Sequence, residues 1–369
     1  MPRHDVAIYA PFAARLYERR PSVTGGAERQ TTLLAAGLAR LGLRVAHIVL
    51  PVEVPGGLPP GVRLVERQPF GAGKRGGRAR EMARIWRALA EADADTYVFR
   101  SGLPALGINA LFCRLRDRQL VFSSANNLDF TFSFLREKRP ELEMYRFGVR
   151  RADAVAVQSG DQAQLARTAF PTVERVVEIP SFAEPAAAAE APGEAFLWAG
   201  RLDEYKQPVR YLELAERLPE SRFWMVPKFL HERPTLADEV RERAARLPNL
   251  EVLDPRPHAE AMRLVERSVA IVNTGAAEGM PNFFLEAWAR GVPVLSFEFD
   301  PDGRIEGRGL GISASGSWER FEDGARELWR SRASRSNVSS RVRGYVEEVH
   351  GLDAVSTRWR ELLESLADR

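Results

Sequence analysis

The chain has 369 residues, of which 45% are hydrophobic and 28% are charged, and its formal net charge is +3. This length predicts two domains, and the composition is that of a folded globular protein. A single cysteine excludes an internal disulfide framework and any multi-cysteine metal site, and no apolar stretch is long enough to span a membrane. Because the N-terminus lacks the apolar segment of a signal peptide, we expect a cytoplasmic protein.

Short β-branched or aromatic runs alternate with helical patterns through the first half of the chain. Near-continuously apolar strands separated by helices predict a parallel sheet that is covered on both faces. Strands are expected at 5–10, 44–50, 62–66, 96–100, 119–123, 153–158 and 176–179, and helices at 27–41, 78–92, 104–116, 137–149 and 162–170.

A Pro/Ala-rich stretch at 180–194 has no evident apolar face, so we interpret it as an interdomain linker. Strands then recur at 195–199, 222–226, 250–253, 269–273 and 292–297, and an amphipathic helical pattern runs from Val338 to the end. The predicted architecture is α/β, with two doubly wound domains facing a ligand cleft. The predicted boundaries are 1–180 for the N-terminal domain, 181–194 for the linker, 195–345 for the C-terminal domain and 346–369 for a C-terminal helix.

The segment from Glu278 to Gly291 is the strongest functional signal. Gly279 and Pro281 break the chain after an apolar strand, and proline suits the first position of a helix. Glu278 then precedes the helix and Glu286 lies in its second turn. The N–H groups and dipole at the helix start favour an anion, while carboxylates accept hydrogen bonds from hydroxyl groups. A phosphate combined with polyols describes a nucleotide sugar.

Such charges usually belong to a solvated helix face, but Glu286 is bracketed by apolar residues and is costly there without partners. Two other loops follow strands. One contains Gly25 and Gly26 before a helix, and by itself it favours a plain capped loop. The other projects Arg201 and Lys206, whose cationic groups suit phosphate.

Other patterns are weaker. The run from Gly71 to Gly76 fits the GxGxxG pattern but follows the third strand, so we interpret it as a basic loop near an acceptor. The Asp93/Asp95 and Asp300/Asp302 pairs are interpreted as helix-end and turn residues, and no metal site is expected. For His258, contact with a base and helix capping remain equal alternatives.

In their order, these motifs resemble the retaining glycosyltransferase family 4, whose members have the GT-B fold of two Rossmann-like domains. The resemblance rests on the Gly-Gly-Ala-Glu loop, the Gly-Arg-Leu-x-x-x-Lys loop and the paired glutamates followed by Ala-x-Gly-x-Pro-Val. It covers most of the chain. It implies an N-terminal acceptor domain, a C-terminal donor domain and a final helix that crosses back towards the N-terminal domain.

The resemblance also implies roles. Arg201 and Lys206 would hold the donor pyrophosphate, Glu286 the ribose hydroxyls and Glu278 the transferred sugar. Catalytic roles are thus expected for Glu278, Arg201 and Lys206. Donor binding is expected from Gly200, Arg201, Lys206, His258, Gly279, Met280, Pro281, Asn282, Phe283 and Glu286, and the N-terminal cleft would include Gly25, Gly26, Asn127 and Asp129.

Two positions depart from the family pattern. Many relatives carry a histidine after the fifth strand. This chain has none there, and either Asn127 or Asp129 would take its place. Many also follow the lysine with glycine, where this chain has Gln207. The family's acidic residues are intact, so we expect an active enzyme.

The function expected from the resemblance is retaining, metal-independent transfer of a sugar from a nucleotide-diphosphate sugar to a hydroxyl group. No cofactor is expected. The acceptor is left open as a glycan, a lipid-linked or a small molecule, as is peripheral contact with the inner face of the membrane. The alternatives are a nucleotide-sugar epimerase or hydrolase and a non-catalytic sugar-nucleotide-binding protein. Nucleic acid is the least favoured partner, because the arginines are scattered with few interleaved aromatic residues.

Overall fold

The chain forms two compact units. The computed structural model describes residues 3–18, 25–54, 56–69, 77–100, 105–131, 139–228, 234–276, 279–334 and 336–367. Unit 1 comprises Met1–Phe182 together with Leu352–Arg369, and unit 2 comprises Ala183–Gly351. The chain therefore leaves unit 1 once and returns to it for its last helix.

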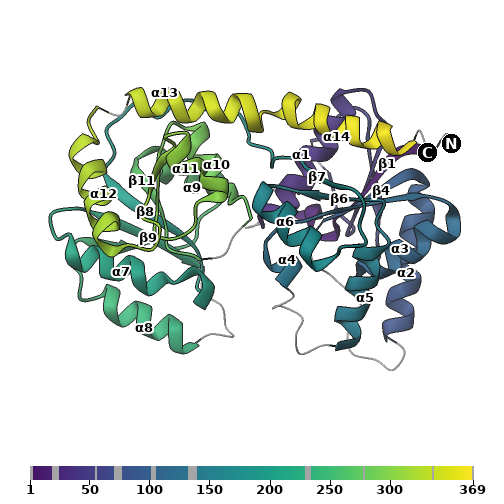
Figure 1. Ribbon diagram of the computed structural model, residues 1–369, viewed down its shortest axis with the longest axis horizontal. Coiled ribbons are helices and arrows are strands. Elements are labelled where there is room, and N and C mark those ends of the chain that lie inside the picture. Colours follow the sequence, from purple (N-terminus) through teal and green to yellow (C-terminus); the bar gives the residue numbers. More distant parts are fainter. Residues whose placement is uncertain are drawn as a thin grey trace. The chain divides into compact units, whose positions relative to one another are not determined.

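Within the described residues, unit 1 contains a seven-stranded parallel sheet (Figure 1). The strand order β3-β2-β1-β4-β5-β6-β7 reverses between β1 and β4, which makes the sheet doubly wound. Its strands are β1 (His4–Tyr9), β2 (Val45–Val49), β3 (Val62–Glu66), β4 (Ala94–Arg100), β5 (Gln119–Ser123), β6 (Ala154–Val157) and β7 (Val176–Glu178).

Helices cover both faces of this sheet (Figure 1). The helix α1 (Gly26–Arg40) packs with α14 (Leu352–Ala367) over one core, whereas α2 (Gly77–Ala92), α3 (Ala105–Arg116) and α5 (Arg139–Arg150) pack over the other. The remaining helices of the unit are η1 (Pro11–Leu16), α4 (Leu128–Thr131) and α6 (Gly160–Ala169). The predicted two-sided parallel sheet is confirmed.

Unit 2 repeats this design in the part that the structure describes. Its six parallel strands have the order β10-β9-β8-β11-β12-β13, with the reversal between β8 and β11. They are β8 (Ala195–Arg201), β9 (Phe223–Lys228), β10 (Leu250–Val252), β11 (Ser268–Asn273), β12 (Val294–Ser296) and β13 (Gly311–Ser313). All of β11 is buried, which explains why its sequence is apolar without alternation.

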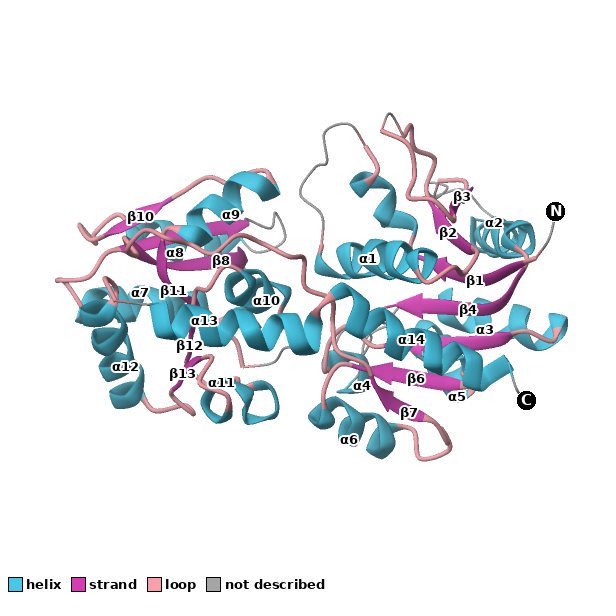
Figure 2. Cartoon of the chain, turned by 90° about the horizontal axis from the view of Figure 1, so that it is seen from above, coloured by secondary structure: helices cyan, strands magenta, loops and turns pink. Residues whose placement is uncertain are grey.

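Two layers of helices enclose the sheet of unit 2 (Figure 2). One face carries α7 (Pro208–Arg217), α8 (Pro234–Ala244) and α12 (Trp318–Ser331), and the other carries α9 (His258–Glu266), α10 (Asn282–Ala289), α11 (Arg304–Gly307) and α13 (Ser336–Tyr345). The short helices η3 (Glu204–Lys206) and η4 (Pro301–Gly303) and the π-helix η5 (Val346–His350) complete the unit.

Three sequence expectations need correction. The strand β13 was not predicted, because three residues between glycines resemble a turn. The 180–194 segment does have a buried face, since Ala183 is buried and Ala186 and Ala189 pack against the unit 2 core. Its small alanines hide this face from a hydrophobicity pattern.

The amphipathic stripe expected after Val338 is not one continuous helix. It is interrupted at Gly351, between η5 and α14. Its two parts serve different cores: Val342 and Val346 pack in unit 2, whereas Val355 and Trp359 pack in unit 1. A periodic apolar pattern predicts a buried face but does not say which core buries it.

Candidate functional site

Two of the predicted loops meet at the reversal point of the unit 2 sheet. Arg201 ends β8, and Thr274 directly follows β11, the neighbouring strand. The Thr274 hydroxyl donates a hydrogen bond to the Lys206 carbonyl oxygen at 2.7 Å, and the Ala276 N–H donates to the Tyr205 carbonyl oxygen at 3.3 Å. The cationic loop is thus fixed to the loop that leads to α10. Ligands of doubly wound sheets bind at this reversal point.

The side chain of Thr274 is itself held in place by a residue of β8. It is fully buried, and its Oγ1 accepts a hydrogen bond from the Trp198 indole N–H at 3.1 Å. Trp198 lies in β8, so the threonine links the strand, the cationic loop and the β11 loop. Thr274 was not predicted from the sequence, although its place directly after an apolar strand was a usable signal.

Tyr205 brings the two predicted cations together. Its hydroxyl oxygen accepts a hydrogen bond from Arg201 Nη2 at 2.9 Å, and Lys206 Nζ lies 5.3 Å from the centroid of its ring. Two positive groups on one side chain provide a local anion-attracting surface. Sequence analysis did not identify Tyr205 as the residue that joins them.

The backbone explains one departure from the family pattern. Gln207 has φ 47° and ψ 53°, in the left-handed region that glycine adopts without strain. Its Oε1 is buried and has no hydrogen-bond partner among the described residues. The chain turns sharply there so that Pro208 can begin α7. At Gly200, by contrast, an added Cβ would lie an ordinary 3.5 Å from Trp198, so the fold does not itself demand glycine.

The helix after β11 begins one residue later than predicted. Pro281 occupies the cap position of α10, and Asn282 is its first residue. The Pro281 carbonyl oxygen accepts from the N–H groups of Phe284 and Leu285, so the helix's own bonds begin at Phe284. The N–H groups of Asn282 and Phe283 lie in the first turn, where an anion is favoured.

Met280 and Gly279 are buried, so the Met280 side chain serves the core and only its backbone remains for a ligand. Phe283 also packs partly against that core. Glu278, the first predicted catalytic residue, lies outside the described residues.

Glu286 lies in the second turn of α10, as predicted. Its Oε1 lies 3.7 Å from Nε2 of His258, and its side chain keeps 18% of its surface exposed. A carboxylate among apolar neighbours needs a polar partner, and His258 provides one for Glu286. His258 is the first residue of α9 and Pro257 holds the cap position, so the capping alternative for His258 is wrong.

The unit 1 candidates serve partly structural roles. Gly25 caps α1 and Gly26 is its first residue. The Asp129 carboxylate is buried, and its Oδ2 accepts hydrogen bonds from Ala125 N at 2.7 Å, Asn126 N at 3.1 Å and Ser124 Oγ at 3.1 Å. Asp129 thus holds its own loop together. Asn127 Oδ1 is buried and, among the described residues, has no hydrogen-bond partner.

Arg100 at the end of β4 adds a half-buried cation to this region, which was not predicted from the sequence. Its Nη1 donates to Ser123 Oγ at 2.8 Å. Burial lowers the pKa of Arg100 to about 10, which the nearby negative charges of Asp129 and Glu28 partly offset. Burial raises the pKa of Asp129, and its three hydrogen bonds and Arg100 oppose that shift.

Several solved structures share the fold along almost the whole chain. HepE from Anabaena in complex with UDP has a TM-score of 0.70 and 15% identity, covering 98% of this chain and 100% of HepE. Sucrose-phosphate synthase from Thermosynechococcus elongatus has a TM-score of 0.75 and 14% identity, covering 99% and 100%. WaaG, a glycosyltransferase involved in lipopolysaccharide biosynthesis, has a TM-score of 0.68 and 17% identity, covering 97% and 99%. No curated protein sequence matches the chain.

Residues 25–181 match the family model of the glycosyl transferase 4-like domain. The chain carries a glycosyl transferase 4-like domain. The predicted family resemblance is thereby supported over residues 25–181, and the solved structures confirm the α/β two-domain fold. The roles of the individual site residues remain predictions.

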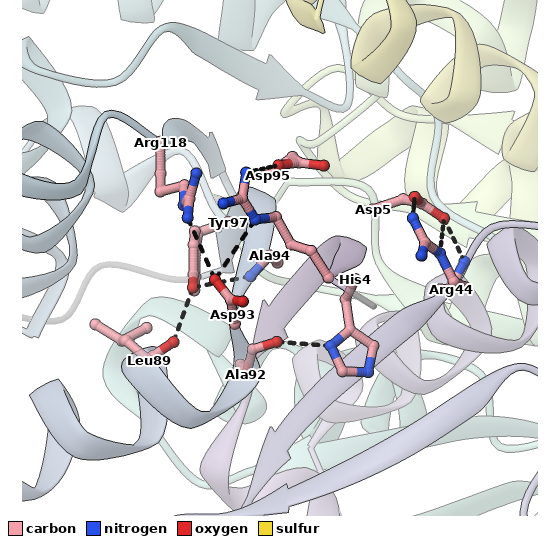
Figure 3. A network of polar contacts seen from close by, with 11 residues as sticks. His4, Asp5, Arg44, Leu89, Ala92, Asp93, Ala94, Asp95, Tyr97 and Arg118 are labelled. Atoms are coloured by element: carbon pink, nitrogen blue, oxygen red, sulfur yellow. Dashed lines mark hydrogen bonds and ion pairs between the residues drawn. The ribbon is translucent and has the colours of Figure 1, made fainter. Parts of the chain in front are cut away.

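Within this glycosyl transferase 4-like domain, Asp93 and Asp95 are structural. They lie at the amino end of β4, which ends at Arg100. Figure 3 shows the two carboxylates within a network of polar contacts. Arg3 Nη1 lies 2.9 Å from Asp95 Oδ1, and Arg118 Nη2 lies 3.2 Å from Asp93 Oδ1. Neither carboxylate is therefore placed to bind a nucleotide's ribose at the carboxyl edge.

The second acidic pair is also engaged by the fold. The Asp300 carboxylate accepts hydrogen bonds from Ile305 N at 2.7 Å and Glu306 N at 3.2 Å, and Asp302 Oδ2 lies 2.6 Å from Arg304 Nη2. In the described part of the chain, no three His, Cys, Asp or Glu side chains gather as a metal ion would need. The run from Gly71 to Gly76 lies outside the described residues.

No helix among those described has the length and apolar character to cross a bilayer. Cys113 is buried, and its burial raises the pKa of the thiol. A thiol kept protonated is a poor nucleophile, so Cys113 contributes packing and no chemistry.

Proposed function

We propose that the chain is a retaining, metal-independent glycosyltransferase that takes its sugar from a nucleotide-diphosphate sugar bound in unit 2. The observation that carries this proposal is the hydrogen bond between Thr274 and the Lys206 carbonyl. It holds the two cations, which suit a diphosphate, beside the loop leading to the α10 helix start, at the reversal point of the sheet.

The solved structures support the choice of donor. HepE has been crystallised with UDP and with UDP-glucose, and its fold matches this chain over 98% of its length. We therefore expect a uridine nucleotide as the first donor to test. Glu286 would accept hydrogen bonds from the ribose hydroxyls, and its contact with His258 would orient the carboxylate.

The reaction breaks the bond between the anomeric carbon and the β-phosphate oxygen and forms a bond from that carbon to the acceptor oxygen. The bonding electrons leave with the diphosphate, and the acceptor proton passes to a phosphate oxygen. Arg201, Lys206 and the α10 start would stabilise the departing negative charge, a role that needs no metal when such groups are in place. Same-face attack without a protein nucleophile would retain the anomeric configuration, as the family resemblance implies.

We also propose that the acceptor group is a hydroxyl, which a glycan could carry, and that the protein is cytoplasmic. The rival activity is epimerisation or hydrolysis of the nucleotide sugar. A donor-only incubation separates them, because an epimerase or hydrolase turns over the donor without an acceptor, whereas a transferase needs one.

The first experiment is a thermal-unfolding panel of nucleoside diphosphates and their sugars, with and without a chelator. A ligand of the native state raises its unfolding temperature. The second compares Lys206→Ala with Lys228→Ala, a control at the exposed end of β9. We expect Lys206→Ala to lower kcat by about 10²–10³-fold and the control to retain activity. No stabilisation by any nucleotide, or equal activity in both variants, would refute the proposed site.

A further inference from the structure

Unit 1 contains a cavity that the donor site does not use. Its volume is about 660 Å³, within the usual range for small-molecule sites. Its walls come from the carboxyl ends of β1 and β3 and from the first two turns of α2, α3 and α5, which lie side by side on one face of the sheet (Figure 1). The carboxyl edge of an open α/β sheet is where ligands bind.

The cavity has an apolar lining that remains partly exposed. Phe12, Met82 and Met144 line it with 40%, 45% and 36% of their surface exposed, whereas Ile85 is buried and Ile108 is half-buried. Large apolar side chains clustered around a hollow indicate a binding site more strongly than scattered ones. Methionine side chains adapt to ligands of varied shape.

The charged residues of the wall neutralise one another. Among the described lining residues, the charged ones form two ion pairs: Arg67 with Glu81, and Arg78 with Glu141 at 3.9 Å. Arg67 is fully buried, so its charge belongs to the wall. The charged side chains among the described lining residues therefore carry no net charge, and the rest of that lining is apolar. An uncharged apolar group fits it best.

We propose that this cavity binds the apolar portion of the acceptor, an uncharged alkyl, prenyl or aryl group that carries the hydroxyl to be glycosylated. This inference rests on the proposed transferase function and names its acceptor class. Burial of the apolar group supplies the affinity, while a charged analogue would lose its hydration in the apolar lining without gaining a partner. The affinity should therefore depend on chain length.

The test measures binding of n-alkyl β-D-glucosides from butyl to octyl, each below its micelle concentration, by titration calorimetry with the full-length protein. Each added methylene should raise the affinity about fourfold while the cavity has room. Met82→Glu and Met144→Glu place a carboxylate in the cavity and should each weaken octyl glucoside binding at least tenfold. Met82→Leu should retain binding. Leu115→Glu is the matched control, because Leu115 is 64% exposed on α3 and does not line the cavity.

An affinity independent of chain length, or equal losses in Met82→Glu and Leu115→Glu, would overturn the proposal. Thermal unfolding checks the folding of each variant, and UDP binding checks separately that the proposed donor site in unit 2 is intact. If the wild-type protein binds no nucleotide but its affinity for the glucosides still rises with chain length, only the proposed donor site is refuted. Normal nucleotide binding without chain-length dependence would refute this cavity alone.

Discussion

The hydroxyl of Thr274 donates a 2.7 Å hydrogen bond to the main-chain carbonyl of Lys206, sixty-eight residues earlier in the sequence. Together with the bond from the Ala276 N–H to the Tyr205 carbonyl oxygen, it fixes the cationic loop through a side chain that carries no charge. The Trp198 indole N–H in turn fixes the orientation of the threonine hydroxyl. Anion binding in unit 2 should therefore depend on a neutral side chain beneath the site.

Thr274→Val removes the hydroxyl while keeping the shape of the side chain. It leaves the buried Trp198 N–H without its acceptor, so we expect a loss of about 1–3 kcal/mol in the free energy of unfolding of unit 2. Displacement of Lys206 should also raise the Kd for a nucleoside diphosphate about tenfold. Titration calorimetry and urea unfolding measure the two effects. Thr274→Ser keeps the hydroxyl and should bind nearly as well as wild type; equal weakening in both variants would contradict the mechanism.

Gln207→Gly tests the strained turn that follows Lys206. Glycine adopts the left-handed backbone without the steric cost that a Cβ brings, but it gains more entropy in the unfolded chain. We expect a net stabilisation of about 0.5–1 kcal/mol, seen as a higher unfolding temperature. Gln207→Ala retains the Cβ and should give no such gain. A destabilising glycine would show that the Gln207 side chain contributes more than its backbone strain removes.

The parallel sheets, most strands and the order of the site loops were predictable, because strands buried on both faces and loops at their carboxyl ends leave clear patterns. Other features depend on tertiary contacts. Thr274 and Tyr205 acquire their importance only when β8 and β11 become neighbours. The cavity below Met82 and Met144 is likewise invisible in the sequence, where each methionine reads as part of an ordinary amphipathic helix.

Substitution of Asp129 should lower the stability of unit 1, whereas substitution of Asn127 should change the rate of sugar transfer. Asp129→Ala leaves the half-buried N–H of Ala125 without its acceptor, so we expect unit 1 to lose about 1–3 kcal/mol. Asn127→Ala removes an oxygen that has no partner among the described residues and should leave stability within about 0.5 kcal/mol. If Asn127 replaces the family histidine, its variant should alter kcat for sugar transfer. Unfolding curves and initial rates give both answers, and an unchanged rate would remove Asn127 from the site.

Because of His47, we expect the stability of unit 1 to fall in acid. It is fully buried in β2, where its Nδ1 lies 2.8 Å from the Tyr17 hydroxyl. Burial lowers its pKa to about 3, while an unfolded histidine titrates near 6.5. Between these values the unfolded chain binds a proton that the folded chain does not. His47 therefore removes stability as pH falls from about 6.5 to about 3, by up to about 1.4 kcal/mol per pH unit.

Native-state hydrogen exchange of the β2 amides, followed across that pH range, measures this loss. His47→Gln cannot take up the proton and should show a shallower dependence of stability on pH, even if it is less stable at pH 7. Parallel pH profiles for the two proteins would show that other groups govern the acid response.

The return of the chain to unit 1 inverts the usual order of assembly during synthesis. Unit 2 is complete once Gly351 has left the ribosome, whereas unit 1, which starts first, still lacks α14. Until then the surface of α1 that receives Val355, Trp359 and Leu363 remains uncovered. The first unit to be made is therefore the last to close, and a stop codon before α14 would damage the end of the protein that was translated first.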